Sequence, residues 1–439
     1  MKLLAQRFLP LLALLLVLAA CGNPLTGNTT AGGPGKNSTA ATSTTIPATG
    51  SADICPADLQ NSRGCLTPHA MQTIYGVSSL LQKGFTGKGQ TVIDLVSFGS
   101  PTLQQDMQVF DQTFNLPPVN LQIISPLNVP EYDPRGDKGG WAGETELDVQ
   151  IIHSIAPDAK IVVLVSPVAE TEGTIGLPEF RQLEQYAIDH KLGNIVSQSW
   201  GASELTLEDQ QGQQELQKWN DLLQQATTQQ GMTYFGSSGD NGATDYADIQ
   251  GNHIANVATT SFAADSPWVT AVGGTTVSRS GTTVAETAWR DSGGGFSRFY
   301  KTPSYQQGLP ASVQQQLNNR RGVPDVSAAA DPFTGLAIYL NGSWSIAGGT
   351  SASAPVWAGL MAIANQEAGH PLGFINPALY KLAASSTYTQ DFRDITTGTN
   401  TNNSANVQGY AAVPGWDAVT GLGSPNAEKL IPDLIAAMK

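Results

Sequence analysis

The sequence predicts an α/β fold with a central, mostly parallel sheet covered by helices. Two observations carry this prediction. Short segments rich in β-branched residues, bounded by Gly, Pro or polar turns, have the pattern of strands. Longer segments with helical periodicity lie between them, and this alternation is typical of a parallel sheet with helices on both faces. The 439 residues are enough for one large domain or two ordinary ones.

The expected strands and helices alternate along the chain. Strands are expected at residues 90–98, 159–167, 193–201, 231–240 and 267–274. Helices are expected at residues 144–156, 177–190 and 204–230, and a buried helix within 348–362. In open α/β sheets, active sites collect at the carboxyl ends of strands. The stretches SWG (199–201) and GSSGD (236–240) fall at such ends.

The composition is acidic. The chain has 22 Lys and Arg against 36 Asp and Glu, a net charge of −14, and no basic run, so nucleic acid is not an expected partner. Only 13% of the residues are charged. Acid denaturation comes mostly from paired carboxylates that must take up protons, so the composition fits an acid-tolerant protein. It fits a merely acidic extracellular protein equally well.

Residues 1–21 have the features of an export signal. Lys2 and Arg7 give a positive start, and residues 9–18 an apolar stretch. The sequence LAAC then resembles a bacterial lipobox, which predicts lipidation of Cys21 and a membrane-anchored lipoprotein on the cell surface. Ordinary signal cleavage, giving a secreted protein, is the alternative. No second apolar run is long enough to span a membrane, so the lipid is the expected membrane contact.

Residues 22–54 are rich in Gly, Ser, Thr and Pro and have almost no large apolar side chain, which predicts a flexible tether. Residues 55–439 are expected to form the folded domain. Cys55 and Cys65 lie at its start, and a disulfide is the simplest state of one remaining pair in an exported protein. His69 is close to them, but a fourth zinc ligand is missing.

The stretch GGTSASAP has the pattern of a nucleophile turn that presents Ser351. A serine hydroxyl needs a base to take its proton, and the usual base is histidine. The chain has five histidines, and none has the His-Gly-Thr setting of a subtilisin-type protease. His153 alone lies on a promising helix, where a packed structural histidine is the simpler interpretation.

The same helix carries two carboxylates. Glu144 and Asp148 are four residues apart, hence on one helix face. Taken alone, they are explained by the helix dipole, which favours acidic residues in a first turn. Asp240 follows an expected strand within SSGDNG. A turn residue is the simple interpretation there, and a side chain pointing into a cleft is the functional one.

Seven sequence blocks together resemble the sedolisin family, the serine-carboxyl peptidases. The resemblance runs from about residue 66, at LTPHAMQTIYGV, to the C-terminus. The blocks follow in family order: GETELDVQIIHSIAPDAKI, VSQSWG, SSGDNGA, GGGFSRFY, RGVPDVSAAADP, GGTSASAP and PGWDAVTGLGSP. One block would be a weak signal, whereas seven in order are highly specific.

The resemblance implies a subtilisin-like three-layer fold and a peptidase that forms an acyl-enzyme on Ser351. It implies that Glu144 is the general base, that Asp148 orients it, and that Asp240 is the acid of the oxyanion hole. An aspartic acid donates a hydrogen bond only while protonated, so the expected pH optimum is acidic. The implied substrates are peptides or denatured proteins, cleaved internally or as tripeptides.

Two further sites follow from the resemblance. Ser199, Trp200 and Gly201 would hold the substrate backbone by strand-like hydrogen bonds. The family has a C-terminal calcium site, and one structural Ca²⁺ would be held here by two carboxylates and three backbone carbonyls, a set that suits this cation: Asp394, Ile395, Val413, Gly415 and Asp417. Without the resemblance, these stretches would be interpreted as polar loops with no ion.

The sequence departs from the family pattern in two places. Family members usually carry a long N-terminal pro-domain, whereas only the tether separates signal and catalytic domain here. Three alternatives follow for an otherwise monomeric protein: the domain folds unaided, a separate chain acts as chaperone or inhibitor, or the protein is no longer a working peptidase. Some relatives extend the carboxyl network with a glutamate near the first strand, where Ser97 is expected here, so a shorter network behind Glu144 is expected.

Two alternatives stay open from the sequence. A non-catalytic surface lipoprotein would use the same cleft to bind peptides or another protein, although all four catalytic positions carry the expected residues. A subtilisin-like peptidase would use His153 as its base. A neutral-to-alkaline optimum, and activity that survives Glu144→Gln, would favour the second.

Overall fold

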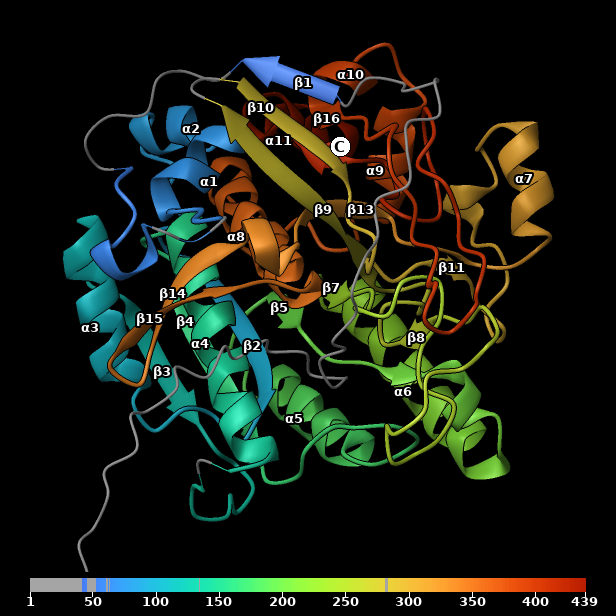
Figure 1. The fold of residues 1–439 in the computed structure, drawn as a ribbon, viewed down its shortest axis with the longest axis horizontal. Helices are drawn as coiled ribbons and strands as arrows, with labels where there is room; N and C mark the ends of the chain where they lie inside the picture. Colours follow the sequence, from blue (N-terminus) through green and yellow to red (C-terminus); the bar gives the residue numbers. More distant parts are fainter. Residues whose placement is uncertain (1–41, 46–52, 61, 63, 134, 281–282) are drawn as a thin grey trace, which may run out of the picture.

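The structure, a computed structural model, describes residues 42–45, 53–60, 62, 64–133, 135–280 and 283–439 (Figure 1). Within these residues, one nine-stranded sheet contains β1 (Thr42–Thr45), β2 (Thr91–Ser97), β3 (Asn120–Ile124), β4 (Lys160–Ser166), β5 (Ile195–Gln198), β7 (Thr233–Ser237), β9 (Thr270–Ser280), β10 (Thr283–Ala288) and β13 (Val326–Ala329). The order is β1-β10-β9-β7-β5-β2-β4-β3, with β13 also paired to β9. The pairs from β3 to β9 and to β13 are parallel, and β10 and β1 are antiparallel additions.

The central strands are buried on both faces. Every residue of β5 and β7 is buried, as is every residue of β2 and β4 except the first. Parallel sheets covered by helices have such continuous apolar runs rather than alternating ones. The five strands predicted from the sequence all belong to this sheet, and the predicted fold class is confirmed.

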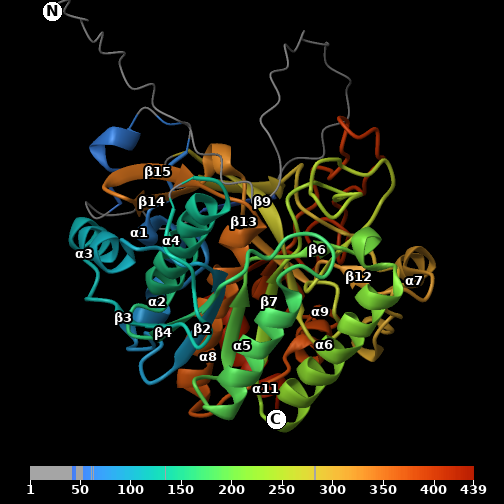
Figure 2. The same cartoon turned by 90° about the horizontal axis from the view of Figure 1, so that it is seen from below.

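Helices cover both faces of the sheet (Figures 1 and 2). The long helices α4 (Asp137–Ile155) and α8 (Thr350–Ala368) pack on each other on one face, and α5 (Leu177–Asp189) and α6 (Gln210–Gln229) lie on the other. The remaining helices are α1 (Pro68–Ile74), α2 (Ser78–Gln82), α3 (Leu103–Phe114), α7 (Ala311–Leu317), α9 (Asn376–Ala383), α10 (Tyr388–Asp391) and α11 (Ala427–Ala437). None of the described helices is long and apolar enough to cross a membrane.

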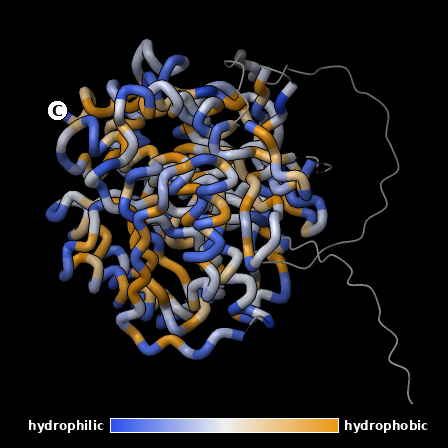
Figure 3. The backbone as a smooth tube through the Cα atoms, turned by 90° about the vertical axis from the view of Figure 1, so that its left-hand side faces the viewer, coloured by the Kyte–Doolittle hydropathy of each residue, from blue (hydrophilic) through white to orange (hydrophobic). Residues whose placement is uncertain are grey.

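One apolar core joins these layers. Apolar segments occur throughout the folded body (Figure 3). A single cluster of buried apolar side chains extends from Leu59 to Leu434. The layers therefore share this main core, and two small clusters that contain Ile395 and Ala264 lie apart from it. Within the described residues, four two-stranded sheets lie outside the large sheet: β6 (Ala202–Ser203) with β8 (Ser261–Phe262), β11 (Gly295–Phe296) with β12 (Gly322–Val323), β14 (Leu336–Leu340) with β15 (Ser343–Ala347), and β16 (Phe392–Arg393) with β17 (Ser424–Pro425).

The two buried helices α4 and α8 approach closely at a glycine. A Cβ added to Gly359 would lie 2.7 Å from the Cβ of Ile155 and 3.4 Å from the carbonyl oxygen of Ile152. Eight residues before Gly359 on α8 is Ser351, and eight residues before Ile152 on α4 is Glu144. At 1.5 Å per residue, both steps cover about 12 Å. The contact at Gly359 therefore sets the level at which Ser351 and Glu144 meet.

Two predicted helices differ from the structure at their starts. Residues 204–207 form a 3-10 turn, so the helix predicted over 204–230 begins only at α6. Asp209 caps α6, because its Oδ1 accepts a hydrogen bond from Gly212 N at 2.7 Å. The helix predicted over 144–156 begins earlier, at Asp137. Its first turns are rich in glycine, which gives no helix signal in a sequence.

The structure describes one short part of the predicted tether. Residues 42–45 form β1, which pairs with β10 and is an edge strand rather than a free linker. An edge strand can be held by backbone hydrogen bonds alone, so a composition without large apolar side chains does not reveal it. Residues 1–41 and 46–52 lie outside the described residues, and the signal, Cys21 and most of the tether lie there.

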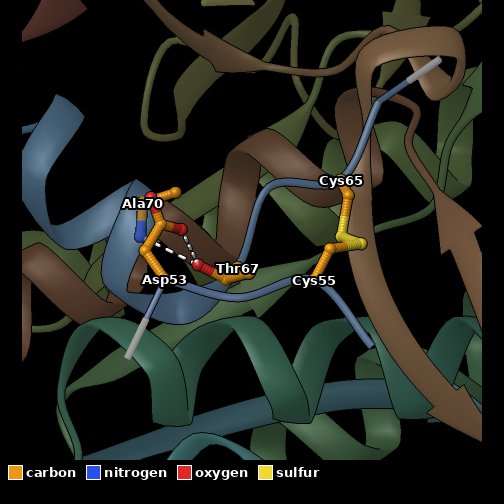
Figure 4. Close-up of a disulfide and its surroundings, with 5 residues drawn as sticks. All are labelled: Asp53, Cys55, Cys65, Thr67 and Ala70. Atoms are coloured by element: carbon orange, nitrogen blue, oxygen red, sulfur yellow. Dashed lines mark hydrogen bonds between the residues drawn. A yellow bond between two sulfur atoms is a disulfide. The ribbon is translucent and has the colours of Figure 1, made fainter. Parts of the chain in front are cut away.

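A disulfide joins Cys55 and Cys65 at the start of the domain (Figure 4). Beside it, Thr67 Oγ1 donates to Asp53 Oδ1 at 2.5 Å and accepts from Ala70 N at 3.1 Å. Thr67 thereby caps α1 and fixes the chain that leads into it.

The residue after the disulfide extends a hairpin that leads to the nucleophile turn. Leu66 N donates to Gly335 O at 2.8 Å, and Leu66 O accepts from Ala337 N at 3.0 Å. These bonds add Leu66 to the edge of β14. The partner strand β15 ends at Ala347, directly before Gly348. The start of the domain and the turn before Ser351 are therefore coupled through one small sheet.

Candidate active site

A cleft of about 370 Å³ opens at the carboxyl ends of the central strands. Residues that follow β4, β5 and β7 line it, together with the first turns of α4 and α8. Ser351 and residues 199–201 lie in its wall. Six of its lining residues are acidic and none is basic: Asp137, Glu144, Glu170, Glu172, Asp240 and Asp245.

Ser351 lies in the first turn of α8. Gly349, immediately before the helix, has a φ of 100°, a conformation that L side chains rarely adopt. A Cβ there would also lie 2.6 Å from Asp240 Oδ2. Glycine is thus required both by the turn and by the approach of Asp240. The turn presents Ser351 to the cleft with 7% of its surface exposed.

Glu144 on α4 is the carboxyl that meets Ser351. Burial raises the pKa of Glu144, and a hydrogen bond from the Ser351 hydroxyl acts in the opposite direction. Negative charges on Asp240 and Asp94 raise this pKa further. A carboxylate in contact with a serine hydroxyl is placed to accept its proton.

Asp148 lies one turn further along α4 and is fully buried. Ser199 Oγ donates to Asp148 Oδ1 at 2.8 Å and lies 3.2 Å from the carbonyl oxygen of Ser351. Burial, followed by charges on Asp94 and Glu144, raises the pKa of Asp148 well above its ordinary value. The Ser199 side chain therefore supports the carboxyl network.

A fourth carboxyl, Asp94 on β2, was not predicted from the sequence. It is buried close to Asp148, whose pKa its charge raises, and burial raises the pKa of Asp94 itself to about 7. Ser97, where the family comparison placed the end of the network, instead donates to Val168 O at 2.8 Å. Behind Glu144, a buried carboxyl on β2 therefore stands at a position other than Ser97. The available signal was an Asp inside the apolar run QTVIDLVSF, because an unpaired carboxyl is costly inside a sheet.

Asp240 follows β7 and approaches the nucleophile turn from the strand side. Its Oδ1 accepts hydrogen bonds from Thr350 N and Thr350 Oγ1, both at 2.8 Å. Burial raises the pKa of Asp240 to about 6, and the bonds from Thr350 act in the opposite direction. In its protonated form this carboxyl can donate to an oxyanion that forms beside Ser351.

Trp200 anchors the segment that follows β5. Its ring is buried, with centroids 4.9 Å from Phe180, 5.7 Å from Trp219 and 6.3 Å from Phe262. Aromatic rings at such distances stabilise one another in offset or edge-to-face packing. The anchor fixes the adjoining backbone of Gly201, which lines the cleft.

His153 lies too far along α4 to serve as the base. Its Nε2 is 3.0 Å from Pro117 O and 3.1 Å from Asp111 Oδ1. The ring is fully buried between α4 and its neighbours and does not line the cleft. These contacts agree with the interpretation of His153 as a packed structural residue.

The two carboxylates predicted to bind calcium lie near one another. Asp394 Oδ2 accepts from Gly415 N at 3.0 Å, and Asp417 Oδ2 accepts from Val413 N at 3.0 Å. Burial, followed by the charges of both carboxyls, raises the pKa of Tyr388. The described residues contain no group of three or more His, Cys, Asp or Glu that could hold a metal. An ion here would need backbone carbonyls as well.

The chain is similar to known peptidases. A model of the subtilase family matches residues 139–411. Kumamolisin from Bacillus sp. (strain MN-32) is 37% identical over 312 residues, which cover 69% of this chain and 52% of kumamolisin. Tripeptidyl-peptidase 1 of Homo sapiens is 32% identical over 320 residues, covering 68% of this chain and 53% of that protein.

A solved peptidase structure is similar to this protein in both fold and sequence. Pseudomonas sedolisin, a serine-carboxyl proteinase complexed with two molecules of pseudo-iodotyrostatin, superposes with a TM-score of 0.70 at 28% identity, covering 85% of this chain and 98% of that one. The chain belongs to the subtilase family. Within that family, its relatives identify it as a sedolisin. It spans about half the length of the curated relatives described above.

Proposed function

We propose that this protein is a serine-carboxyl peptidase that hydrolyses peptide bonds through an acyl-enzyme on Ser351. One observation carries the proposal: the buried carboxyl of Glu144 shares the cleft with Ser351, whose hydroxyl acts to lower the Glu144 pKa, in the place of a histidine base. Asp240 adjoins the same turn. Membership of the sedolisins supports this assignment.

Each group has a defined part in the reaction. Glu144 takes the Ser351 proton while the serine oxygen forms a bond to the substrate carbonyl carbon. The carbonyl oxygen becomes negative and accepts a hydrogen bond from protonated Asp240. Glu144 returns the proton to the leaving amine as the C–N bond breaks. Water then attacks the ester by the same route, while Asp148 keeps Glu144 in place.

This chemistry needs Glu144 ionised and Asp240 protonated at the same time. With a pKa of about 6, Asp240 keeps its proton below that pH and loses it above. Burial is the main cause that raises the pKa of Glu144, to about 8. The Ser351 hydroxyl lowers this pKa, and it falls further once Asp240 and Asp94 are neutral. The proposed enzyme is therefore active in acid and loses activity as the pH rises through about 6.

The test is an assay of the exported protein and its Ser351→Ala variant on a denatured protein, from about pH 3 to about pH 8. We expect cleavage in acid by the parent and none by the variant. Glu144→Gln should abolish cleavage as well. Peptide binding without turnover, or activity that survives Glu144→Gln, would overturn the proposal. Mass spectrometry of the products separates internal cleavage, which we propose, from release of tripeptides.

We also propose one structural Ca²⁺ near the C-terminus. Asp394 and Asp417 would supply carboxylates, and Ile395, Val413 and Gly415 backbone carbonyls, which are oxygen ligands that this cation prefers. The hydrogen bonds from Gly415 and Val413 already hold both carboxyls against one turn. The ion would pin this turn to the Asp394 loop and supply no step of the reaction.

Chelation tests the ion. At a free Ca²⁺ concentration about 100 times Kd, binding to the folded state alone adds about 2.7 kcal/mol to the free energy of unfolding. A chelator should therefore lower the Tm of the parent, and Asp417→Asn should make the Tm insensitive to it. A parent Tm that is the same with chelator and with added Ca²⁺ would exclude the site.

We propose further that the protein is exported and anchored through lipid on Cys21. The export-type signal supports this, and so does the disulfide between Cys55 and Cys65, because disulfides persist in oxidising compartments. Labelling cells with a fatty acid should mark the parent and not Cys21→Ser. Unlabelled parent protein in the medium would show ordinary secretion instead.

A further inference from the structure

Gln150 is a buried polar side chain on α4 that the proposed chemistry does not use. It lies six residues after Glu144 and is 1% exposed. Its Nε2 donates to the carbonyl oxygen of Tyr339 at 2.7 Å, and its Oε1 accepts from the backbone N–H of Tyr339 at 2.8 Å. The side-chain amide thus binds both backbone groups of one residue on β14, as the backbone of a neighbouring strand would.

Tyr339 lies on the outer edge of the hairpin β14–β15. In an antiparallel pair, alternate residues direct their N–H and C=O groups away from the partner strand. Leu66 takes up two of these groups, the carbonyl of Gly335 and the N–H of Ala337. Tyr339 is next in this alternation, and Gln150 binds it. Helix α4 therefore completes the edge of β14 beyond Leu66, and the hairpin lies against α4 (Figures 1 and 2).

Glu146 fixes which way round the Gln150 amide lies. Its Oε2 accepts from Gln150 Nε2 at 3.0 Å, and its Oε1 accepts from Ser100 Oγ at 2.7 Å. Both N–H groups and the oxygen of the amide are thereby used. A reversed amide would set its oxygen against the carbonyl oxygen of Tyr339 and lose both bonds to β14. The contact is therefore specific for an amide of this length.

The hairpin that Gln150 holds leads to the nucleophile turn. The chain enters the turn of Ser351 from β15 and leaves it through α8. Helix α4 holds both sides, because Gln150 binds the hairpin before the turn and Ile155 packs against Gly359 on the helix after it. Glu144 lies on the same helix, about 9 Å from Gln150 along the axis. The helix that carries the proposed base therefore fixes the nucleophile from two directions.

We propose that Gln150 is a positioning residue of the reaction, which ties the hairpin β14–β15 to α4 and thereby sets Ser351 against Glu144. This inference rests on the proposed peptidase function. Gln150 does not line the cleft, so it acts through the hairpin and not on a substrate. Misplacing a catalytic group by about 1 Å can cost about 100-fold in rate. The proposed substrate segment, residues 199–201, follows β5 and is anchored by the ring of Trp200, so substrate binding does not depend on this tie.

Gln150→Met tests the tie, because methionine has nearly the same volume and makes none of the three hydrogen bonds. We expect kcat to fall about 10- to 100-fold while KM stays within about twofold of the parent value. Gln150→Glu should recover most of this loss at about pH 4, where a buried carboxyl keeps its proton and can both donate to Tyr339 O and accept from Tyr339 N. The control is Thr227→Val, which removes a buried hydrogen bond to Leu223 O on α6 and should leave kcat and KM near the parent values.

A second measurement needs no turnover. The Ser351 hydroxyl lowers the pKa of Glu144, so withdrawal of Ser351 should raise that pKa. An NMR titration of Glu144 should therefore show a higher pKa in Gln150→Met than in the parent, the same direction as in Ser351→Ala. Thr227→Val should leave the Glu144 titration unchanged.

The tie is overturned if Gln150→Met keeps the parent kcat, changes KM alone, or leaves the pKa of Glu144 where it is. It is also overturned if Gln150→Glu is as slow in acid as Gln150→Met, because packing rather than hydrogen bonding would then be what matters. A parent that cleaves no peptide refutes the peptidase proposal, whereas a raised Glu144 pKa in Gln150→Met still supports the tie. If Gln150→Met does not fold, Gln150→Asn gives the same test, since its amide is one methylene short of Tyr339.

Discussion

Two hydroxyl side chains organise the carboxyls around Ser351. Ser199 donates to Asp148, and Thr350 donates twice to Asp240, through its backbone and its side chain. Hydrogen bonds to a carboxylate favour the ionised form, whereas burial favours the protonated form. Each catalytic carboxyl is therefore balanced between two states. Exchange of a single hydrogen-bond partner should be enough to alter the pH range of the enzyme.

Asp240→Asn tests the pH limit that we assign to Asp240. The amide occupies the same space and donates a hydrogen bond at every pH, so the loss of kcat/KM as the pH rises through about 6 should disappear. Asp240→Ala removes the donor and should reduce kcat about 100- to 1000-fold across the whole range. The measurement is a pH profile of kcat/KM for both variants. An unchanged upper limit in Asp240→Asn would assign that limit to another group.

We propose that Asp94 is a positioning residue whose role can be separated from that of Ser97. Asp94 ionises with a pKa of about 7, and its negative charge then raises the pKa of Glu144. Asp94→Asn removes that charge and keeps a polar side chain beside Asp148, so an NMR titration of Glu144 should show less protonation around pH 7 and above than in the parent. Ser97→Ala should leave the Glu144 titration unchanged, because Ser97 bonds to Val168 instead. A titration that changes in Ser97→Ala and not in Asp94→Asn would reverse these roles.

At this scale, the sequence predicts the residues that belong to motifs. Ser351, Glu144 and Asp240 stand in recognisable blocks, and the structure brings all three to one cleft. Asp94 and Glu170 stand in no such block. The position of Asp94 depends on the pairing of β2 with β4, and that of Glu170 on the turn that follows β4. The spacing of residues along the sequence predicts neither.

The contact between α4 and α8 is the element that sets the geometry of the site. Gly359→Ala would place a methyl group 2.7 Å from Ile155 Cβ, which cannot rotate away. Overpacking of this kind costs about 1–3 kcal/mol, and misplacing a catalytic group by about 1 Å can cost about 100-fold in rate. We expect a lower Tm and a clearly lower kcat/KM.

Gly308→Ala is the matched control, since a Cβ on Gly308 meets nothing within 4 Å. It should leave both Tm and kcat/KM near the parent values. If Gly359→Ala were as active and as stable as Gly308→Ala, the two helices would have enough freedom to adjust, and the close contact would not determine the register of Ser351 against Glu144.

The elements themselves were predictable where periodicity was strong. All five predicted strands and the body of each predicted helix are present. The errors fall at ends. The start of α4 has glycines in place of an apolar pattern, and the start of α6 is decided by the Asp209 cap and by the β6–β8 pair. Tertiary contacts, which a local pattern does not contain, fix these boundaries.

Over the whole molecule, many carboxyls are buried without a basic partner. In the unfolded chain such groups ionise near pH 4. In the folded protein they keep their protons to higher pH, because burial raises the pKa to about 7 for Asp94, about 8 for Glu146 and Glu184, and about 9 for Glu172. Between these limits the folded state binds more protons than the unfolded state. The free energy of unfolding therefore falls as the pH rises above about 4.

Urea unfolding at about pH 5 and about pH 8 measures this effect, and we expect the protein to be several kcal/mol more stable at the lower pH. Each group contributes at most about 1.4 kcal/mol per pH unit. Glu184→Gln removes one such group, and the loss of stability between the two pH values should shrink accordingly. Glu428→Gln should not change it. Greater stability at about pH 8 would contradict the burial argument.

The bond between Cys55 and Cys65 has a practical consequence for anyone who prepares this protein. The disulfide adjoins Leu66, which is hydrogen-bonded to the edge of β14. The partner strand β15 leads directly into the turn before Ser351. Opening a loop of this size forfeits about 2–3 kcal/mol of chain constraint. Reducing agents in a purification buffer would therefore loosen the turn that positions Ser351. Recombinant protein made in a reducing cytosol would lack the disulfide and its contribution to stability from the start.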